Sequence, residues 1–197
     1  MSRKNELRTS VEGLYRDKGS KFLAYLYPIG KEEDVAALLE TLRKSHPSAR
    51  HWCYAWRLGE DGDRYRINDD GEPAGSAGRP ILHALDGAQL TNVLGVVVRY
   101  FGGTLLGVRG LIDSYGGAVN DALAQAMVTP ITHWRSLKIS CAYAAMASLQ
   151  SVMNELHLKP HSSQYSENEV TFEFKADDVL IKALLYKTES IYGVNVV

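Results

Sequence analysis

The spacing of apolar and polar residues divides the chain into alternating strands and helices. Period-two alternation predicts a strand at 21–28 (KFLAYLYP), and paired strands at 51–58 and 64–67 flank the turn GEDGD. The apolar run at 93–101 predicts a buried strand. Helical spacing predicts helices at 31–45, 75–85 and 105–127.

After Pro130 the pattern becomes more regular. It predicts strands at 134–143, 159–165, 169–175 and 192–197, and helices at 145–156 and 177–189. This order, β-α-β-β-α-β, is the ferredoxin-like pattern. We therefore expect an α+β protein with two domains, residues 1–130 and 131–197.

The amino-acid composition indicates only the broad class of protein. The chain has 197 residues, a net charge of -1, and two cysteines, Cys53 and Cys141, without a metal-binding or disulfide pattern. The N-terminal stretch MSRKNELRTS lacks the apolar core of a signal peptide, and no run approaches 18 apolar residues. We expect a cytoplasmic protein without a membrane partner.

The stretch RYFGGTLLG, residues 99–107, connects the apolar strand to the third predicted helix. A strand, a glycine-rich turn and a helix form the layout that binds anions through free N–H groups. The frame from Gly102 to Gly107 resembles a P-loop, but Val108-Arg109 replaces the lysine and hydroxyl that nucleoside triphosphates require. The simpler interpretation is a tight turn at Gly102 and Gly103, with Thr104 as the helix N-cap and Arg99 as a structural hydrogen-bond donor.

The acidic stretch Asn68-Asp69-Asp70-Gly71-Glu72-Pro73 precedes a second glycine-rich segment, 74–80. Its carboxylates favour hard cations, yet the spacing and closing glutamate of an EF-hand are absent. The alternative is a solvated turn whose acids cap the next helix or pair with arginines. The glycines at 75–78 would let the backbone approach a ligand or the RYFGG turn.

Candidate nucleophiles and bases are present without a recognisable catalytic frame. The nucleophiles are Ser76, Cys53 and Ser114, and the bases are His51 and His83. His51 and Cys53 share one side of a predicted strand, which allows contact but does not activate the thiol. Catalysis is therefore the alternative hypothesis.

Arginines and aromatic residues are interspersed between Lys44 and Lys138, a segment that contains no other lysine. The arginine fork suits bidentate contacts with phosphate or carboxylate and stacks on aromatic rings. This pattern is typical of a surface that binds RNA or an acidic protein segment. Seven acidic residues between Glu60 and Asp86 leave open an internal ion-pair network instead.

Two long motifs in this order resemble the signature of the IMPACT family: NDDGEPAGSAGRPIL and NVLGVVVRYFGGTLLGVRGLIDSYGGAV. HWCYAWRL is similar to a strand of the same family, and the resemblance covers residues 18 to 127. It implies an N-terminal βαβ domain of the ribosomal-protein and elongation-factor superfold. The last block is similar to the extra domain of bacterial members and to the terminal ferredoxin-like module of elongation factor G.

The resemblance also implies a role in translation. Eukaryotic relatives compete for the activator of a starvation-sensing initiation-factor kinase, and nucleic-acid or ribosome binding has been suggested for bacterial members by fold analogy. Two positions depart from the family pattern. Ser76 replaces a threonine, and Asp113 stands where an arginine is usual. Arg109, one helical turn earlier, is spaced to pair with Asp113, which would neutralise the charge expected there.

We therefore predict a non-enzymatic protein that regulates translation by binding RNA, the ribosome or a translation-associated protein, without DNA sequence specificity, cofactor or metal. The alternative is a hydrolase or transferase that uses the DDGEP acids and His51. The acidic and RYFGG motifs should share one groove, with Arg99 or Arg79 pairing with an acid of the DDGEP stretch. The predicted binding residues are Asp69, Asp70, Glu72, Ser76, Arg79, Arg99, Tyr100, Gly102, Gly103 and Arg109.

Overall fold

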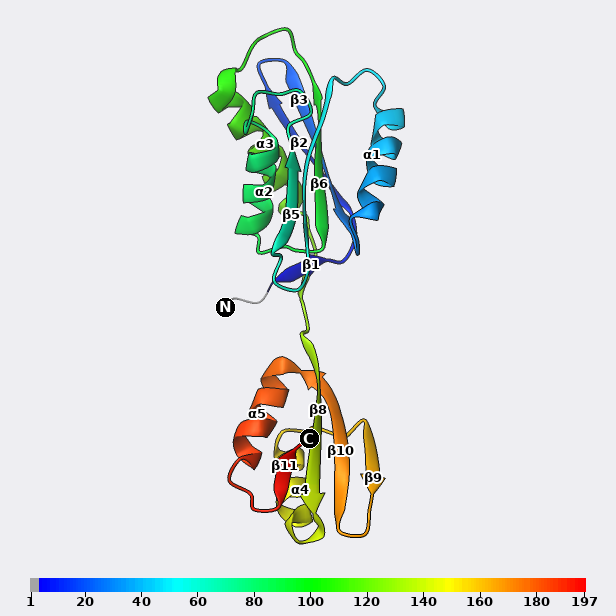
Figure 1. Cartoon of the computed structure of the whole chain (residues 1–197). Helices are drawn as coiled ribbons and strands as arrows, with labels where there is room; N and C mark the ends of the chain where they lie inside the picture. The colour runs from blue at the N-terminus through cyan, green and yellow to red at the C-terminus, as the bar shows by residue number, and fades with distance from the viewer. Residues whose placement is uncertain (1–3) are drawn as a thin grey trace. The chain divides into compact units, whose positions relative to one another are not determined.

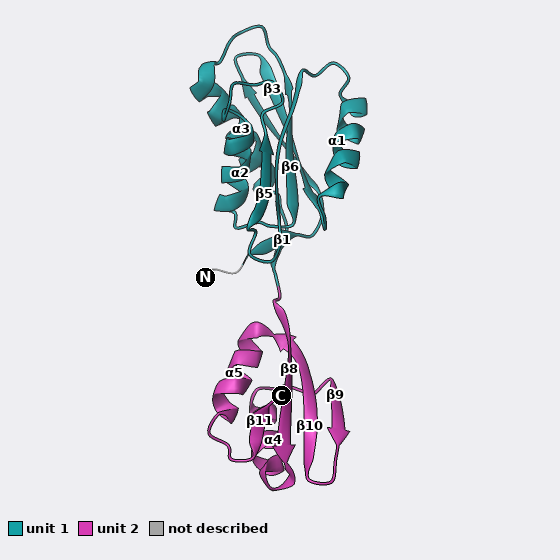
Figure 2. Cartoon of the chain, in the orientation of Figure 1, with its two compact units in different colours: residues 1–131 teal, residues 132–197 magenta. Residues whose placement is uncertain are grey.

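The computed structural model describes residues 4–197 and divides the chain into two compact units, 1–131 (unit 1) and 132–197 (unit 2) (Figure 2). Its sheets and α-helices confirm the predicted α+β class (Figure 1). Each unit has its own apolar core, as expected for segments that bury enough apolar surface to stay compact.

The sheet of unit 1 is antiparallel and has five strands in the order β2-β3-β6-β4-β5. The central strand β6 (Val93–Tyr100) is the apolar run of the sequence, and it is buried up to Arg99. Its neighbours are β3 (Ser20–Pro28) and β4 (His51–Leu58), and the edges are β2 (Val11–Asp17) and β5 (Arg64–Asn68). Burial of β6 on both faces explains why it lacks alternation.

Helices cover both faces of this sheet (Figure 1). The larger core lies between the sheet and helices α2 (Gly78–Gly87) and α3 (Gly107–Leu123), around Phe22, Ile81 and Tyr115. On the opposite face, α1 (Glu33–Ser45) packs Val35 and Leu42 onto strand residues that include many aromatics. The structure thus places successive residues of each strand in two different environments.

A small sheet joins the two ends of unit 1. Strand β1 (Asn5–Leu7) pairs with β7 (Val128–Pro130), and the register joins Asn5 to Pro130. The beginning and the end of unit 1 are therefore paired with each other immediately before the chain enters unit 2.

Unit 2 contains the predicted order β-α-β-β-α-β. Its strands are β8 (Trp134–Ala142), β9 (Ser162–Tyr165), β10 (Glu169–Asp177) and β11 (Val194–Val196), arranged in the antiparallel order β11-β8-β10-β9. Helices α4 (Met146–Glu155) and α5 (Asp178–Thr188) contribute Leu149, Ile181 and Leu184 to the core, and a short 3-10 turn, η1 (Tyr143–Ala145), leads into α4.

The structure of unit 1 differs from the sequence predictions at β2 and at the beginnings of two helices. Strand β2 was not predicted, because only one side of its exposed sequence VEGLYRD packs against α3. The third helix is shorter than predicted. It begins at Gly107 with Leu106 at the N-cap position, so Thr104 is not the cap. The second helix begins at Gly78 rather than at residue 75, since Gly75 has a positive φ of 76°.

Candidate functional site

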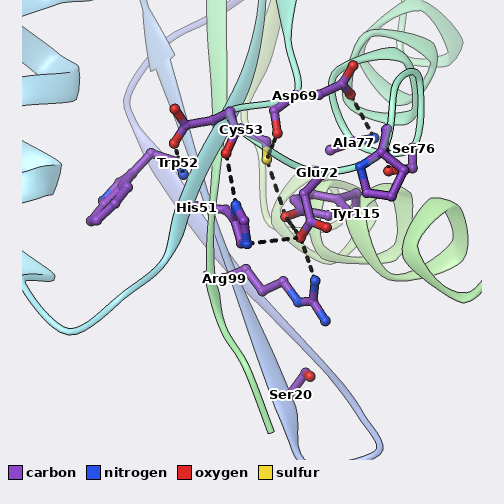
Figure 3. A network of polar contacts seen from close by, with 12 residues as sticks. Ser20, His51, Trp52, Cys53, Asp69, Glu72, Ser76, Ala77, Arg99 and Tyr115 are labelled. Carbon is purple, nitrogen blue, oxygen red and sulfur yellow. Dashed lines mark hydrogen bonds and ion pairs between the residues drawn. The ribbon is translucent and has the colours of Figure 1, made fainter. Parts of the chain in front are cut away.

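The acidic loop between β5 and α2 lies against the end of β6 and contacts it through a buried ion pair (Figure 3). Nη1 of Arg99 lies 2.5 Å from Oε1 of Glu72, and the two side chains are only 7% and 4% exposed. This confirms the predicted pairing of the RYFGG and DDGEP motifs. A buried pair of this kind is mutually dependent, because either charge alone would be left without compensation.

Two further residues complete the surroundings of Glu72. The hydroxyl of Tyr115, from α3, donates to Oε1 at 2.8 Å. His51 also lies beside Glu72. Its Nδ1 donates to the carbonyl of Asp70 at 2.8 Å, and its Nε2 lies 3.9 Å from Oε1 of Glu72. The carboxylate thus connects β4, β6 and α3 through one oxygen.

Cys53 lies in the same network but is not an activated nucleophile. Its thiol donates to the carbonyl of Asp69 at 3.0 Å, and Sγ lies 3.2 Å from the hydroxyl of Tyr115. Burial raises the pKa of Cys53 and that of Tyr115 well above their usual values. Both groups therefore stay protonated near neutral pH, and the thiolate needed for nucleophilic attack does not form.

Asp69 organises the start of α2 from outside the helix. Its carboxylate accepts N–H bonds from Gly75, Ala77 and Gly78 at 2.9, 3.0 and 2.8 Å. Burial opposes the charged form, but these three hydrogen bonds and nearby Arg79 outweigh it, so the pKa of Asp69 is lowered. Asp69 thus satisfies N–H groups that the helix leaves unpaired at its beginning.

Asp70 faces the other side of the sheet. It accepts the backbone N–H of Trp52 at 2.7 Å and pairs with Arg43 of α1 at 3.3 Å. The guanidinium of Arg43 also lies 4.8 Å from the centroid of the Trp52 ring. The second interpretation of the acidic stretch, as acids that cap a helix or pair with arginines, describes these contacts, although the turn is half-buried rather than solvated.

The glycine pair at the exit of β6 has two separate roles. A Cβ at Gly102 would lie 2.0 Å from the backbone carbon of Gly19, in the turn between β2 and β3, so no larger residue fits. The N–H of Gly102 also donates to Oγ of Ser20 at 3.1 Å. Gly103 adopts a positive φ of 88°, which glycine reaches without strain. The pair therefore holds two turns together.

Ser76, Arg79 and Arg109 form no hydrogen bond or ion pair with Glu72 among the described residues. Ser76 is buried and donates to the carbonyl of Pro73 at 2.7 Å. Arg79 and Arg109 are exposed on α2 and α3. Within residues 4–197, no salt bridge joins Arg109 to Asp113, so the predicted neutralisation of this arginine is wrong.

Tyr100 lies on the α1 face, opposite Arg99. Its hydroxyl is 2.8 Å from Nδ1 of His46, whose Nε2 is 2.9 Å from the hydroxyl of Tyr25. Sequence reasoning did not identify His46 or Arg43, because a histidine before a proline and an arginine at a helix end carry no signal of their contacts. Tyr115 was recognised only as part of an apolar stripe.

A groove of about 980 Å³ lies between α2 and α3 in unit 1. Arg79 and His83 line one side, and Ile112 and Asp113 line the other. The described residues contain no group of three or more metal-ligating side chains. Nor is any helix among them sufficiently long and apolar to cross a membrane.

Comparison with known proteins identifies relatives over most of the chain. A model of the Impact N-terminal domain matches residues 18–123. Over 153 residues the chain is 39% identical to the IMPACT family member YigZ of Escherichia coli (strain K12), spanning 75% of this chain and 74% of that protein. The Protein IMPACT homolog of Saccharomyces cerevisiae is 36% identical over 96 residues, which is 46% of this chain and 36% of the yeast protein.

A solved structure extends the similarity to both units. The structure described as "Crystal structure of an hypothetical protein" aligns with 100% of this chain and 97% of its own, with a TM-score of 0.66 and 31% identity. The matched region contains both the acidic loop and the RYFGG turn, so the resemblance predicted from these motifs is confirmed.

Proposed function

Because the chain belongs to the IMPACT family, we propose that it is a non-enzymatic binding protein that acts in the regulation of translation. The observation that supports this role is the family match over residues 18–123, which includes both signature motifs. The partner is RNA, the ribosome or a translation-associated protein, and the site of action is the cytoplasm.

The geometry of the polar network favours binding over catalysis. The carboxylate of Glu72 is held by Arg99 and Tyr115, and that of Asp69 by backbone N–H groups. The Cys53 thiol is kept protonated by burial. The hydrolase or transferase alternative needs at least one of these groups to be available to a substrate, and their internal hydrogen bonds oppose it.

The predicted binding residues separate into two groups by exposure. Internal contacts are formed by Asp69, Asp70, Glu72, Ser76 and Arg99, so their proposed contribution is to fix the shape of the surface. Arg79, Arg109 and the turn at Gly102 and Gly103 are exposed, and Tyr100 is half-buried, so these are the members proposed to reach a partner. Arginine suits phosphate or carboxylate on either kind of partner.

The test is affinity capture of translation components by the full-length chain from a cell lysate, with and without ribonuclease. We expect ribosomal or translation-factor proteins in the captured fraction, and less of them with Arg79→Gln/Arg109→Gln. A matched control is Lys159→Gln/Lys182→Gln, which removes the same charge from exposed positions of unit 2. Capture of no translation component by the wild-type chain would reject the proposal.

A further inference from the structure

A row of cations crosses the sheet of unit 1 beside the RYFGG turn, on the α1 face. Arg16 of β2 is directly opposite Lys21 of β3, and Lys21 is directly opposite Tyr100 of β6. Arg50 continues the row, because its N–H donates to the carbonyl of Arg99 at 3.2 Å and it precedes His51, the register partner of Arg99. We call Arg16, Lys21, Tyr100 and Arg50 the basic row.

The face on which the row lies follows from strand alternation. Leu23, Tyr25 and Tyr27 of β3 pack in the cluster beneath α1, and Lys21 has the same parity along the strand. Tyr100 belongs to the same cluster. Register partners point to one face of an antiparallel sheet, so the side chains of the row gather there.

The cations of the row are exposed and lack acidic partners. Arg16, Lys21 and Arg50 are exposed, and across residues 4–197 none of them takes part in a salt bridge. Like charges directly opposite each other destabilise a strand pair. The pairing of Arg16 with Lys21 therefore has a cost in the isolated protein that a bound anion would remove.

Tyr100 is the aromatic member of the row, and it is held in a fixed position. Its hydroxyl contacts His46, which in turn contacts Tyr25, so the ring is oriented by a chain of two hydrogen bonds. The ring is half-buried and lies between Lys21 and Arg50 in the row. A fixed aromatic among cations combines base stacking with phosphate contact, which is the arrangement that single-stranded nucleic acid requires.

We propose that the basic row binds the phosphate backbone of single-stranded RNA, with a base stacked near Tyr100. The inference rests on the proposed function and specifies its partner. With neighbouring strands about 4.8 Å apart, the row spans about 14 Å from Arg16 to Arg50. That length accommodates a few nucleotides, in keeping with roughly three phosphate contacts.

The test measures binding of a short fluorescein-labelled single-stranded RNA to the full-length chain by anisotropy, over a range of salt concentrations. For three phosphates we expect log K to fall with log salt at a slope of about -2. Arg16→Gln/Lys21→Gln should reduce affinity at low salt by roughly tenfold or more and make the slope shallower by about 1.4.

The matched control is Lys31→Gln/Arg64→Gln, which removes two exposed cations of unit 1 outside the row and gives the same net charge. Unfolding midpoints of both double variants establish that they are folded. Equal losses in the two variants would overturn the proposal, because binding would then depend on overall charge. Equal displacement of the RNA by polyglutamate would also overturn it, in favour of an acidic protein segment.

The two proposals can fail separately. If the wild-type chain binds no RNA at low salt but captures translation proteins after ribonuclease treatment, the basic row is rejected and the proposed function stands. If the chain binds RNA through the row but captures no translation component from a lysate, the row is supported and the role in translation is rejected.

Discussion

Arg99 and Tyr100 are neighbours in β6, but the structure places them in opposite environments. The guanidinium of Arg99 is buried on the side of the sheet where Phe22 packs, and it is paired with Glu72 (Figure 3). Tyr100 points to the α1 face, where it lies among unpaired cations. The two halves of one motif therefore have different consequences, because alternation along the strand assigns one residue to the core and the next to the surface.

The two faces differ mainly in how far their charged side chains are exposed to solvent. Charges on the basic row are exposed, so water and salt screen them and their repulsion is small. The charges of Arg99 and Glu72 are removed from water and depend on each other. Arg99 is thus a residue of the folded core, whereas the cations beside Tyr100 on the other face are available for binding.

The largest expected effect comes from breaking the buried pair. Arg99→Ala leaves Glu72 charged and buried, so we expect a loss of about 3–5 kcal/mol in the free energy of unfolding. Arg16→Ala, on the exposed face, should change it by no more than about 0.5 kcal/mol. Urea unfolding followed by tryptophan fluorescence measures both. Similar stabilities of the two variants would remove the distinction between the faces.

The turn at Gly102 and Gly103, which follows Arg99 and Tyr100 and leads to α3, gives the next largest effect. Gly102→Ala places a Cβ 2.0 Å from the backbone of Gly19, and the shift needed to accommodate it should cost about 1–3 kcal/mol. The control is Gly30→Ala, where nothing lies within 4 Å and the expected change is close to zero. A Gly102→Ala variant as stable as the control would show that the two turns are not held together by this contact.

A smaller, pH-dependent effect belongs to Asp69, which supports the buried face by capping α2. Its pKa is lowered in the folded protein, so its contribution is present above the unfolded value of about 3.9 and is lost as pH falls through the folded value. Asp69→Asn should cost about 0.5–2 kcal/mol near pH 7. The gap to the wild type should close towards pH 2, as urea midpoints at several pH values will show. A gap independent of pH would contradict the charged cap.

Much of the architecture follows from periodicity, but the contacts of the motifs do not. The apolar run of β6 and the alternation of β10 were recognisable because burial alone decides them. Strand β2 was missed, since its inner side is filled by Gly13 and Tyr15 against α3 rather than by an apolar series. Opposite charges near glycine-rich turns predicted that Arg99 or Arg79 would pair with one of the DDGEP acids, and the structure shows which two residues pair, Arg99 and Glu72.

The face that each predicted site residue would occupy was harder to infer. Arg16 and Lys21 are paired across one hairpin, but only the register between β3 and β6 places distant Tyr100 beside them. Without the register, Tyr100 was grouped with Arg99. The role of Gly102 likewise depends on the backbone of Gly19. This contact joins two turns and is not indicated by any local sequence pattern.

The smallest expected effect is that of removing unit 2, because both faces of the sheet compared above belong to unit 1. Both the buried pair and the basic row lie within residues 1–131, where β1 and β7 pair and close the ends of the unit. A fragment of residues 1–131 should therefore fold independently, with the destabilisation by Arg99→Ala unchanged within about 0.5 kcal/mol. Circular dichroism and urea unfolding of the fragment and its variant measure this. Aggregation of the fragment under mild conditions would instead indicate that unit 2 is needed to complete the core on which both faces depend.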